Sequence, residues 1–172
     1  MGLFKKVLGT KEESKVEIDH MIYSPLTGKV VPLSEVNDPV FSQEMMGKGV
    51  AIFPTAGRVI APCNGEIISV FRTLHAITIK ADSGAEIIIH VGLETVALNG
   101  QYFESHVEDG QRIKKGDLLL TFDVEKINEE YDVTTPVIVT NPTNYQSVHA
   151  TGEKEVSCGD PLIDLVGEDS EI

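Results

Sequence analysis

Two histidines on neighbouring predicted strands are the residues with the clearest capacity for chemistry. Residues 71–80 and 85–91 are rich in Ile, Val, Phe and Thr, and residues 81–84 between them are turn formers. This composition predicts two antiparallel strands joined by a tight turn. If the loop has two residues, His75 lies directly opposite His90. Directly paired residues share a face with Cβ atoms about 4.5–5.5 Å apart, so we expect both imidazoles in one pocket.

Two residues close to the histidines support a shared site. Thr73 lies two residues before His75, hence on the same face of a strand, where its hydroxyl can bond one ring nitrogen and select the tautomer. Gly92 lies two residues after His90 and leaves the backbone open beside that ring. A lone histidine is more often a core residue bonded to a backbone carbonyl. The pairing of two histidines favours chemistry over that interpretation.

Two imidazoles in one pocket suit three kinds of chemistry. Zinc binding needs a third protein ligand at about 2.0–2.2 Å, for which Asp38, Glu94 and His149 are candidates, although the sequence has no His-x-His or His-Glu-x-x-His spacing. General acid–base catalysis calls for more polar neighbours than the surrounding Ile and Val provide. In covalent catalysis, one ring nitrogen takes a phosphoryl group while the other ring donates to its oxygens. A carrier of that kind needs an accessible histidine and an apolar rim for docking.

The composition describes an acidic chain with two cysteines. It has 172 residues, enough for one domain with a substantial core, and a formal net charge of −13. That charge argues against nucleic acid as a ligand. Cys63 and Cys158 lie far apart without metal-like spacing, so we expect reduced thiols in a cytoplasmic protein. No apolar run approaches the roughly 20 residues that a membrane-spanning helix needs.

The first residues differ in character from the rest. Residues 2–9 place apolar side chains at helical spacing opposite two lysines, a pattern typical of a basic amphipathic segment on an anionic membrane surface. A frayed terminus is the alternative. We expect residues 1–17 to form a flexible segment and residues 18–172 to form a single domain. The segment predicts peripheral contact with the inner face of the membrane.

From residue 18 onward, short apolar segments alternate with Gly and Pro turns. Residues 24–31 resemble residues 61–68, and residues 116–119 resemble residues 159–163, which indicates duplicated hairpin units. Strands this short at this spacing predict an all-β fold, either an antiparallel β-sandwich or a flattened barrel.

A few short helical turns are expected within this fold. Asp38 is a suitable N-cap, with Pro39 at the first helical position and Gly47 as the stop. Residues 124–131 are the best candidate for a helix of more than one turn.

Five motifs in a fixed order resemble one protein family. They lie at residues 24–28, 38–41, 73–76, 89–98 and 110–117, and read Ser-Pro-Leu-Thr-Gly, Asp-Pro-Val-Phe, Thr-Leu-His-Ala, Ile-His-Val-Gly-Leu-Glu-Thr-Val-Ala-Leu and Gly-Gln-Arg-Ile-Lys-Lys-Gly-Asp. Together they resemble the glucose-type IIA component of the bacterial phosphoenolpyruvate-dependent sugar phosphotransferase system. The likeness runs from about residue 22 to residue 165.

The resemblance implies a role for each matching residue. His90 corresponds to the histidine that accepts a phosphoryl group from the histidine-containing carrier protein and passes it to the IIB domain of a sugar permease. His75 corresponds to the partner imidazole, and Thr73 to the hydroxyl that orients it. The implied partner-binding residues are Asp38, Phe41, Met46, Phe71, Ile88, Glu94 and Val96. The implied activity is that of a phosphotransferase in sugar uptake, with no required cofactor, although zinc can bind the two histidines in some relatives.

The sequence is also compatible with two other classes of protein. A zinc-dependent hydrolase would use His75 and His90 as metal ligands. A lipoyl-like or biotinyl-like module would carry its group on Lys126, because residues 119–127 superficially resemble a modified-lysine hairpin.

Overall fold

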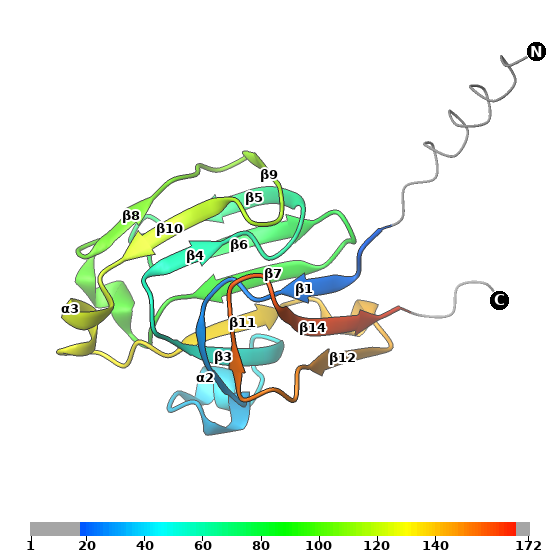
Figure 1. Ribbon diagram of the computed structural model, residues 1–172, viewed down its shortest axis with the longest axis horizontal. Coiled ribbons are helices and arrows are strands. Elements are labelled where there is room, and N and C mark those ends of the chain that lie inside the picture. The colour runs from blue at the N-terminus through cyan, green and yellow to red at the C-terminus, as the bar shows by residue number, and fades with distance from the viewer. Residues whose placement is uncertain (1–17, 168–172) are drawn as a thin grey trace, which may run out of the picture.

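The computed structural model describes residues 18–167 (Figure 1). The predicted terminal segment, residues 1–17, lies outside the described residues. The described strands are β1 (Met21–Tyr23), β2 (Gly28–Val31), β3 (Lys48–Pro54), β4 (Arg58–Ile60), β5 (Gly65–Val70), β6 (Ala76–Ala81), β7 (Glu86–His90), β8 (Phe103–Ser105), β9 (Arg112–Ile113), β10 (Leu118–Phe122), β11 (Thr135–Val139), β12 (Ser147–Ala150), β13 (Glu155–Val156) and β14 (Pro161–Val166). The described helices are η1 (Leu33–Glu35), α2 (Pro39–Ser42), η2 (Thr95–Leu98), α3 (Val124–Asn128) and η3 (Pro142–Asn144).

The strands form three antiparallel sheets. The large sheet has the order β13-β2-β3-β11-β7-β6-β5-β9, and the two smaller sheets have the orders β1-β14-β12 and β4-β10-β8. In Figure 1, β4 and β10 lie toward the left of the molecule, and β14 and β12 lie at its lower right. The main core, which includes Ile52, Ile89 and Leu120, draws buried residues from all three sheets. The predicted all-β sandwich with a few short helical turns is therefore confirmed.

Both faces of the large sheet are covered where the histidine strand runs. Along β7, Ile87 and Ile89 face the main core, whereas Ile88 belongs to a second buried cluster on the opposite face. That cluster also contains Leu33 and Phe41, which come from η1 and α2. The sequence of a strand that is buried on both faces is an unbroken run of apolar residues. This burial explains the consecutive isoleucines before His90.

The β6–β7 hairpin differs from the prediction by one residue. The structure pairs Ala76, not His75, with His90. The loop has three residues instead of two, because Ala81 pairs with Ala85 and Gly84 takes a φ of +96°. A left-handed glycine at the end of a three-residue loop is a common hairpin solution. The predicted register was therefore wrong.

The helical predictions hold at their starts and fail at their ends. The Asp38 carboxylate accepts a hydrogen bond from Val40 N at 3.0 Å and caps α2, as predicted. Helix α2 ends at Ser42, well before Gly47, and α3 ends at Asn128 instead of Tyr131. Within residues 18–167, no helix combines the length and apolar character needed to cross a bilayer.

Candidate active site

His90 ends β7 and is held by the turn that follows it. The chain turns at Gly92, whose φ of +82° favours glycine. A Cβ added at Gly92 would lie only 2.5 Å from Thr95 Cγ2, so the position has no room for a side chain. The Gly92 carbonyl oxygen lies 2.8 Å from His90 Nδ1. A carbonyl only accepts hydrogen bonds, so Nδ1 carries the proton and the lone pair of the neutral ring is on Nε2.

His75 lies immediately before β6 and reaches the same site in spite of the shifted register. Leu74 has a φ of +62°, so the chain leaves regular strand geometry before His75. The His75 carbonyl accepts a hydrogen bond from Val91 N at 2.7 Å, which joins the two segments. The two imidazole rings meet edge to face, with centroids 4.8 Å apart and an angle of 88°. The local backbone break therefore brings together two rings that strand pairing alone would not oppose.

Thr73 fixes one nitrogen of the His75 ring. Its hydroxyl oxygen lies 2.8 Å from His75 Nδ1. If the hydroxyl donates, Nδ1 accepts and His75 Nε2 carries the proton. In this arrangement His75 offers an N–H donor beside the lone pair on His90.

Burial keeps both imidazoles neutral. His75 is 3 % exposed, and burial, together with the neighbouring His90, lowers its pKa to about 4. Burial also lowers the pKa of His90, although the Gly92 carbonyl and the Asp38 charge oppose that effect. Desolvation penalises the charged form of a base. Near pH 7 the site therefore holds two neutral imidazoles.

Aromatic rings pack around the two histidines. The Phe41 ring centroid lies 5.1 Å from that of His90, and the Phe71 centroid lies 5.5 Å from that of His75. Phe41 is only 3 % exposed and Ile88 only 2 % exposed. Although grouped with the docking rim in the sequence, these two residues therefore support the site from beneath its surface.

The other residues of the expected rim are accessible to different degrees. Val96 is 53 % exposed, Glu94 is exposed, and Asp38, Met46 and Phe71 are partly exposed. On the chain around α2, Val40 and Met45 are also exposed, at 38 % and 68 %. The exposed apolar surface around α2 thus includes two residues in addition to the expected rim.

Two residues that support the Gly92 turn were not identified from the sequence. Thr95 is completely buried and donates to the Val91 carbonyl. Asp132, some 40 residues further on, accepts from Leu93 N through its carbonyl. No local pattern signals a contact between segments this far apart. The position of Thr95, three residues after Gly92, is the one local sign of a residue that packs on this turn.

The structure adds no support for the two alternatives, a zinc site and a modified lysine. In the part of the chain that the structure describes, no group of three or more His, Cys, Asp and Glu side chains is arranged to hold a metal ion. Asp38, Glu94 and His149 therefore do not complete a zinc site. Lys126 lies within α3 and not at a hairpin tip, as a swinging-arm lysine would.

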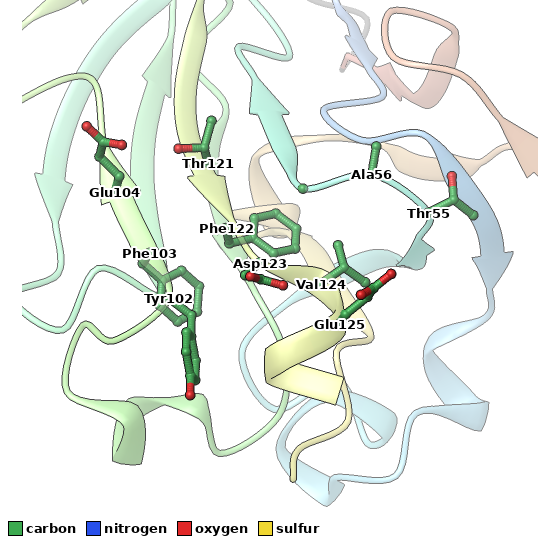
Figure 2. Close-up of a pocket in the computed structure, with 11 residues that line it drawn as sticks. Thr55, Ala56, Tyr102, Phe103, Glu104, Thr121, Phe122, Asp123, Val124 and Glu125 are labelled. Carbon is green, nitrogen blue, oxygen red and sulfur yellow. The ribbon is translucent and has the colours of Figure 1, made fainter. Parts of the chain in front are cut away.

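A groove of about 680 Å³ lies away from the histidines (Figure 2). Figure 2 shows it between β8, β10, α3 and the chain after β3. Its lining includes Tyr102, Glu104 and Glu125 but neither imidazole. This groove is therefore separate from the two histidines.

Comparison with known proteins identifies the family. Residues 20–145 match the family model described as phosphoenolpyruvate-dependent sugar phosphotransferase system, EIIA 1. The PTS system glucose-specific EIIA component of Oceanobacillus iheyensis is 45% identical over 162 residues, covering 94% of this chain and 97% of that protein. The protein of the same name from Bacillus cereus is 49% identical over 150 residues, with coverages of 87% and 89%.

A solved structure agrees with these relatives. The glucose permease IIA from Mycoplasma capricolum matches with a TM-score of 0.78 and 35% identity, covering 83% of this chain and 93% of that one. None of these matches supports a zinc-dependent hydrolase. With full-length relatives, a matching family model and a common β-sandwich, the chain belongs to the EIIA 1 family of the phosphoenolpyruvate-dependent sugar phosphotransferase system.

Proposed function

We propose that His90 is the phosphoryl-accepting residue of a phosphocarrier that serves glucose-type sugar uptake. The donor is the histidine-containing carrier protein, and the acceptor is the IIB domain of a sugar permease. The observation that carries this proposal is the hydrogen bond between His90 Nδ1 and the Gly92 carbonyl, because it leaves the Nε2 lone pair free beside a second imidazole.

The transfer step follows from the two tautomers. The Nε2 lone pair of His90 forms a bond to phosphorus while the bond from phosphorus to the donor's ring nitrogen breaks, and that electron pair returns to the donor. His75 Nε2–H donates a hydrogen bond to a phosphoryl oxygen, and Thr73 holds the ring in that orientation. Because phosphoryl transfer passes through a loose transition state, positioning and charge stabilisation supply most of the catalysis. Transfer to the acceptor runs through the same steps, with His90 as the leaving group.

Docking of the two partners is proposed to use the surface around His90. The exposed apolar residues Val40, Met45 and Val96 supply contact area, and Asp38 with Glu94 supplies negative charge. Complementary charge speeds association more than it raises affinity. Partners with a cationic rim around their own reactive residue suit this surface.

Replacement of single histidines tests the assignment. With phosphoenolpyruvate and the general phosphotransferase proteins, His90→Ala is expected to take up no phosphate, because the acceptor nitrogen is gone. His149→Ala removes an exposed histidine on β12 and is the matched control, expected to take up one phosphate as the wild type does. Full phosphate uptake by His90→Ala would reject the proposal.

A cytoplasmic location with peripheral membrane contact through residues 2–9 is proposed from the sequence alone. These residues combine an apolar stripe with Lys5 and Lys6. Deletion of residues 2–9 should weaken sedimentation with anionic liposomes and leave phosphoryl transfer in solution unchanged. Equal sedimentation of both proteins would show that the segment makes no such contact.

A further inference from the structure

The turn after β7 is anchored on both sides of Gly92. On one side, the fully buried Thr95 hydroxyl donates to the Val91 carbonyl at 2.5 Å. On the other side, Leu93 N donates to the Asp132 carbonyl at 2.8 Å. Neither Thr95 nor Asp132 hydrogen-bonds to an imidazole. Both act on the backbone that carries the acceptor of His90.

The Asp132 contact controls the direction of the Gly92 carbonyl. Gly92 C=O and Leu93 N–H belong to one planar peptide unit. When the N–H is fixed on Asp132, the C=O on the opposite side is fixed toward His90 Nδ1, 2.8 Å away. Hydrogen bonds linked through one peptide also polarise one another. This peptide unit thus connects the His90 ring directly to the loop before β11.

Asp132 is itself held by a local turn. Its carboxylate accepts a hydrogen bond from Thr134 N at 2.9 Å, the pattern of an Asx turn. The side chain therefore keeps its own carbonyl in place for Leu93. Asp132 is exposed, so this feature can be altered without opening the core.

Packing around Gly92 also restricts the backbone of the turn. A Cβ on Gly92 would lie 2.5 Å from Thr95 Cγ2 and 3.1 Å from the Asp132 carbonyl oxygen. Gly92 is therefore enclosed by the same two residues that hold its neighbours. Rotation of the Gly92 carbonyl away from His90 would have to break one of these contacts.

We propose that Thr95 and Asp132 are positioning residues for phosphoryl transfer, which hold the Gly92 carbonyl on His90 Nδ1 and so keep the reactive lone pair on Nε2. The inference rests on the proposed role of His90. Without the two anchors, the neutral ring exchanges between tautomers and orientations. Small misplacement of a reacting group can cost up to about 100-fold in rate.

The first test compares two substitutions of Thr95. Thr95→Val keeps the shape and removes the hydroxyl, whereas Thr95→Ser keeps the hydroxyl. In Thr95→Val we expect kcat for phosphate uptake from the donor protein to fall about tenfold, with KM unchanged, because the docking surface is intact. Thr95→Ser should restore most of the lost kcat. The 15N NMR spectrum of the His90 ring at pH 8 should show a protonated Nδ1 in the wild type and in Thr95→Ser. In Thr95→Val, exchange between the two tautomers should average the chemical shifts of Nδ1 and Nε2.

The second test applies the same logic at an exposed position. Asp132→Asn retains an acceptor for Thr134 N, and Asp132→Ala removes it. In Asp132→Ala, the chemical shifts of the two His90 ring nitrogens should move toward a common average and kcat should fall. Asp132→Asn should resemble the wild type in both measurements. This pair remains decisive if Thr95→Val fails to fold.

A stability control separates positioning from general loosening. Ser24 is fully buried and donates to the Leu26 carbonyl at 2.7 Å in the turn between β1 and β2. Ser24→Ala should lower the thermal midpoint as Thr95→Val does, yet leave the His90 spectrum and kcat as in the wild type. A loss of kcat in Ser24→Ala equal to that in Thr95→Val would overturn the proposal. So would folded Thr95→Val and Asp132→Ala proteins with a protonated Nδ1 and full kcat.

The failure of the underlying function would look different. If His90 is not the phosphorylated residue, the wild type itself leaves His90 unmodified. The nitrogen spectra still report whether Thr95 and Asp132 hold the tautomer, since they need no partner and no phosphate.

Discussion

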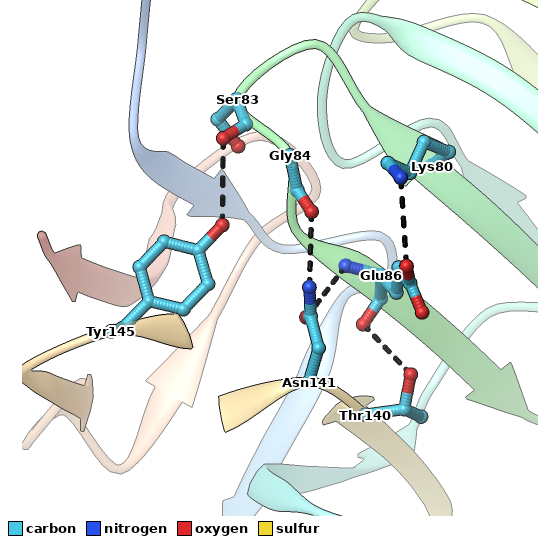
Figure 3. Close-up of polar contacts among 7 residues, drawn as sticks. All are labelled: Lys80, Ser83, Gly84, Glu86, Thr140, Asn141 and Tyr145. Atoms are coloured by element: carbon cyan, nitrogen blue, oxygen red, sulfur yellow. Dashed lines mark hydrogen bonds and ion pairs between the residues drawn. The ribbon is translucent and has the colours of Figure 1, made fainter. Parts of the chain in front are cut away.

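The two ends of the β6–β7 hairpin are both tied to residues that flank β11. At the turn end, Asn141, which follows β11, donates to the Gly84 carbonyl at 3.1 Å and accepts from Glu86 N at 2.9 Å (Figure 3). At the histidine end, Asp132, which precedes β11, accepts from Leu93 N. Hence the two segments that flank one central strand each anchor one end of the hairpin.

The surroundings of the two ends differ. The turn end is close to water: Lys80 and Glu86 form an exposed ion pair at 3.5 Å, and such pairs add little stability. The histidine end is desolvated enough to lower the pKa of both imidazoles. The same kind of anchor therefore fixes a strand register at one end and, by our proposal, a reactive tautomer at the other.

Removing the donor imidazole should have the largest effect on the histidine end. His75→Gln should still take up phosphate on His90, although more slowly than the wild type, and should pass it to the IIB domain about 100-fold more slowly, because donor groups contribute on this scale. The rate of phosphate loss from isolated phosphoprotein on mixing with IIB measures this. His106→Gln, at an exposed site on the β8 side, is the control. Unchanged onward transfer in His75→Gln would restrict His75 to a structural role.

The histidine end should also make stability depend on pH. The pKa of His75 is about 4 in the folded protein and near its usual 6.5 in the unfolded chain. Between these values the unfolded chain binds the proton and the folded protein does not. The contribution of His75 to the free energy of unfolding is therefore most favourable above pH 6.5 and falls as the pH decreases toward 4. From pH 7 to pH 5 the contribution lost is about 2 kcal/mol.

Urea unfolding at both pH values measures this loss. The free energy of unfolding should fall more steeply in the wild type than in His75→Gln, which has no ionisable group at that position. Parallel pH dependences in the two proteins would mean that burial of His75 has no such effect.

The turn end should respond to mutation in stability alone. Asn141→Ala removes both side-chain hydrogen bonds to the hairpin and should cost about 1–2 kcal/mol of unfolding free energy, with kcat unchanged. Asn144→Ala, at an exposed position in η3, is the control and should cost less than half as much. A reduced kcat in Asn141→Ala would show instead that the two ends of the hairpin are coupled.

The sequence predicted those features that depend on local pattern. The isoleucine run before His90, the cap at Asp38 and the short strands between Gly and Pro turns led to the correct fold class. Motif order led to the correct family. Each of these motifs and patterns lies within about ten consecutive residues, and only the order of the motifs extends along the chain.

Features that depend on one backbone angle or on distant segments were not predictable. The left-handed Gly84 lengthened the loop by one residue and shifted the register. The left-handed Leu74 then brought His75 to His90 by a route that strand alternation does not describe. The contact of Asp132 with Leu93 joins segments that no periodicity relates. The burial of Phe41 and Ile88 likewise depends on how α2 packs over the sheet.

Peptide mass analysis tests most directly whether His90 carries the phosphoryl group. The protein would be incubated with phosphoenolpyruvate and the general phosphotransferase proteins, then digested and analysed at alkaline pH, where phosphohistidine survives. We predict one acid-labile phosphate on the peptide that contains His90. A phosphate found only on another peptide, including that of His75, or no phosphate at all, would contradict the account.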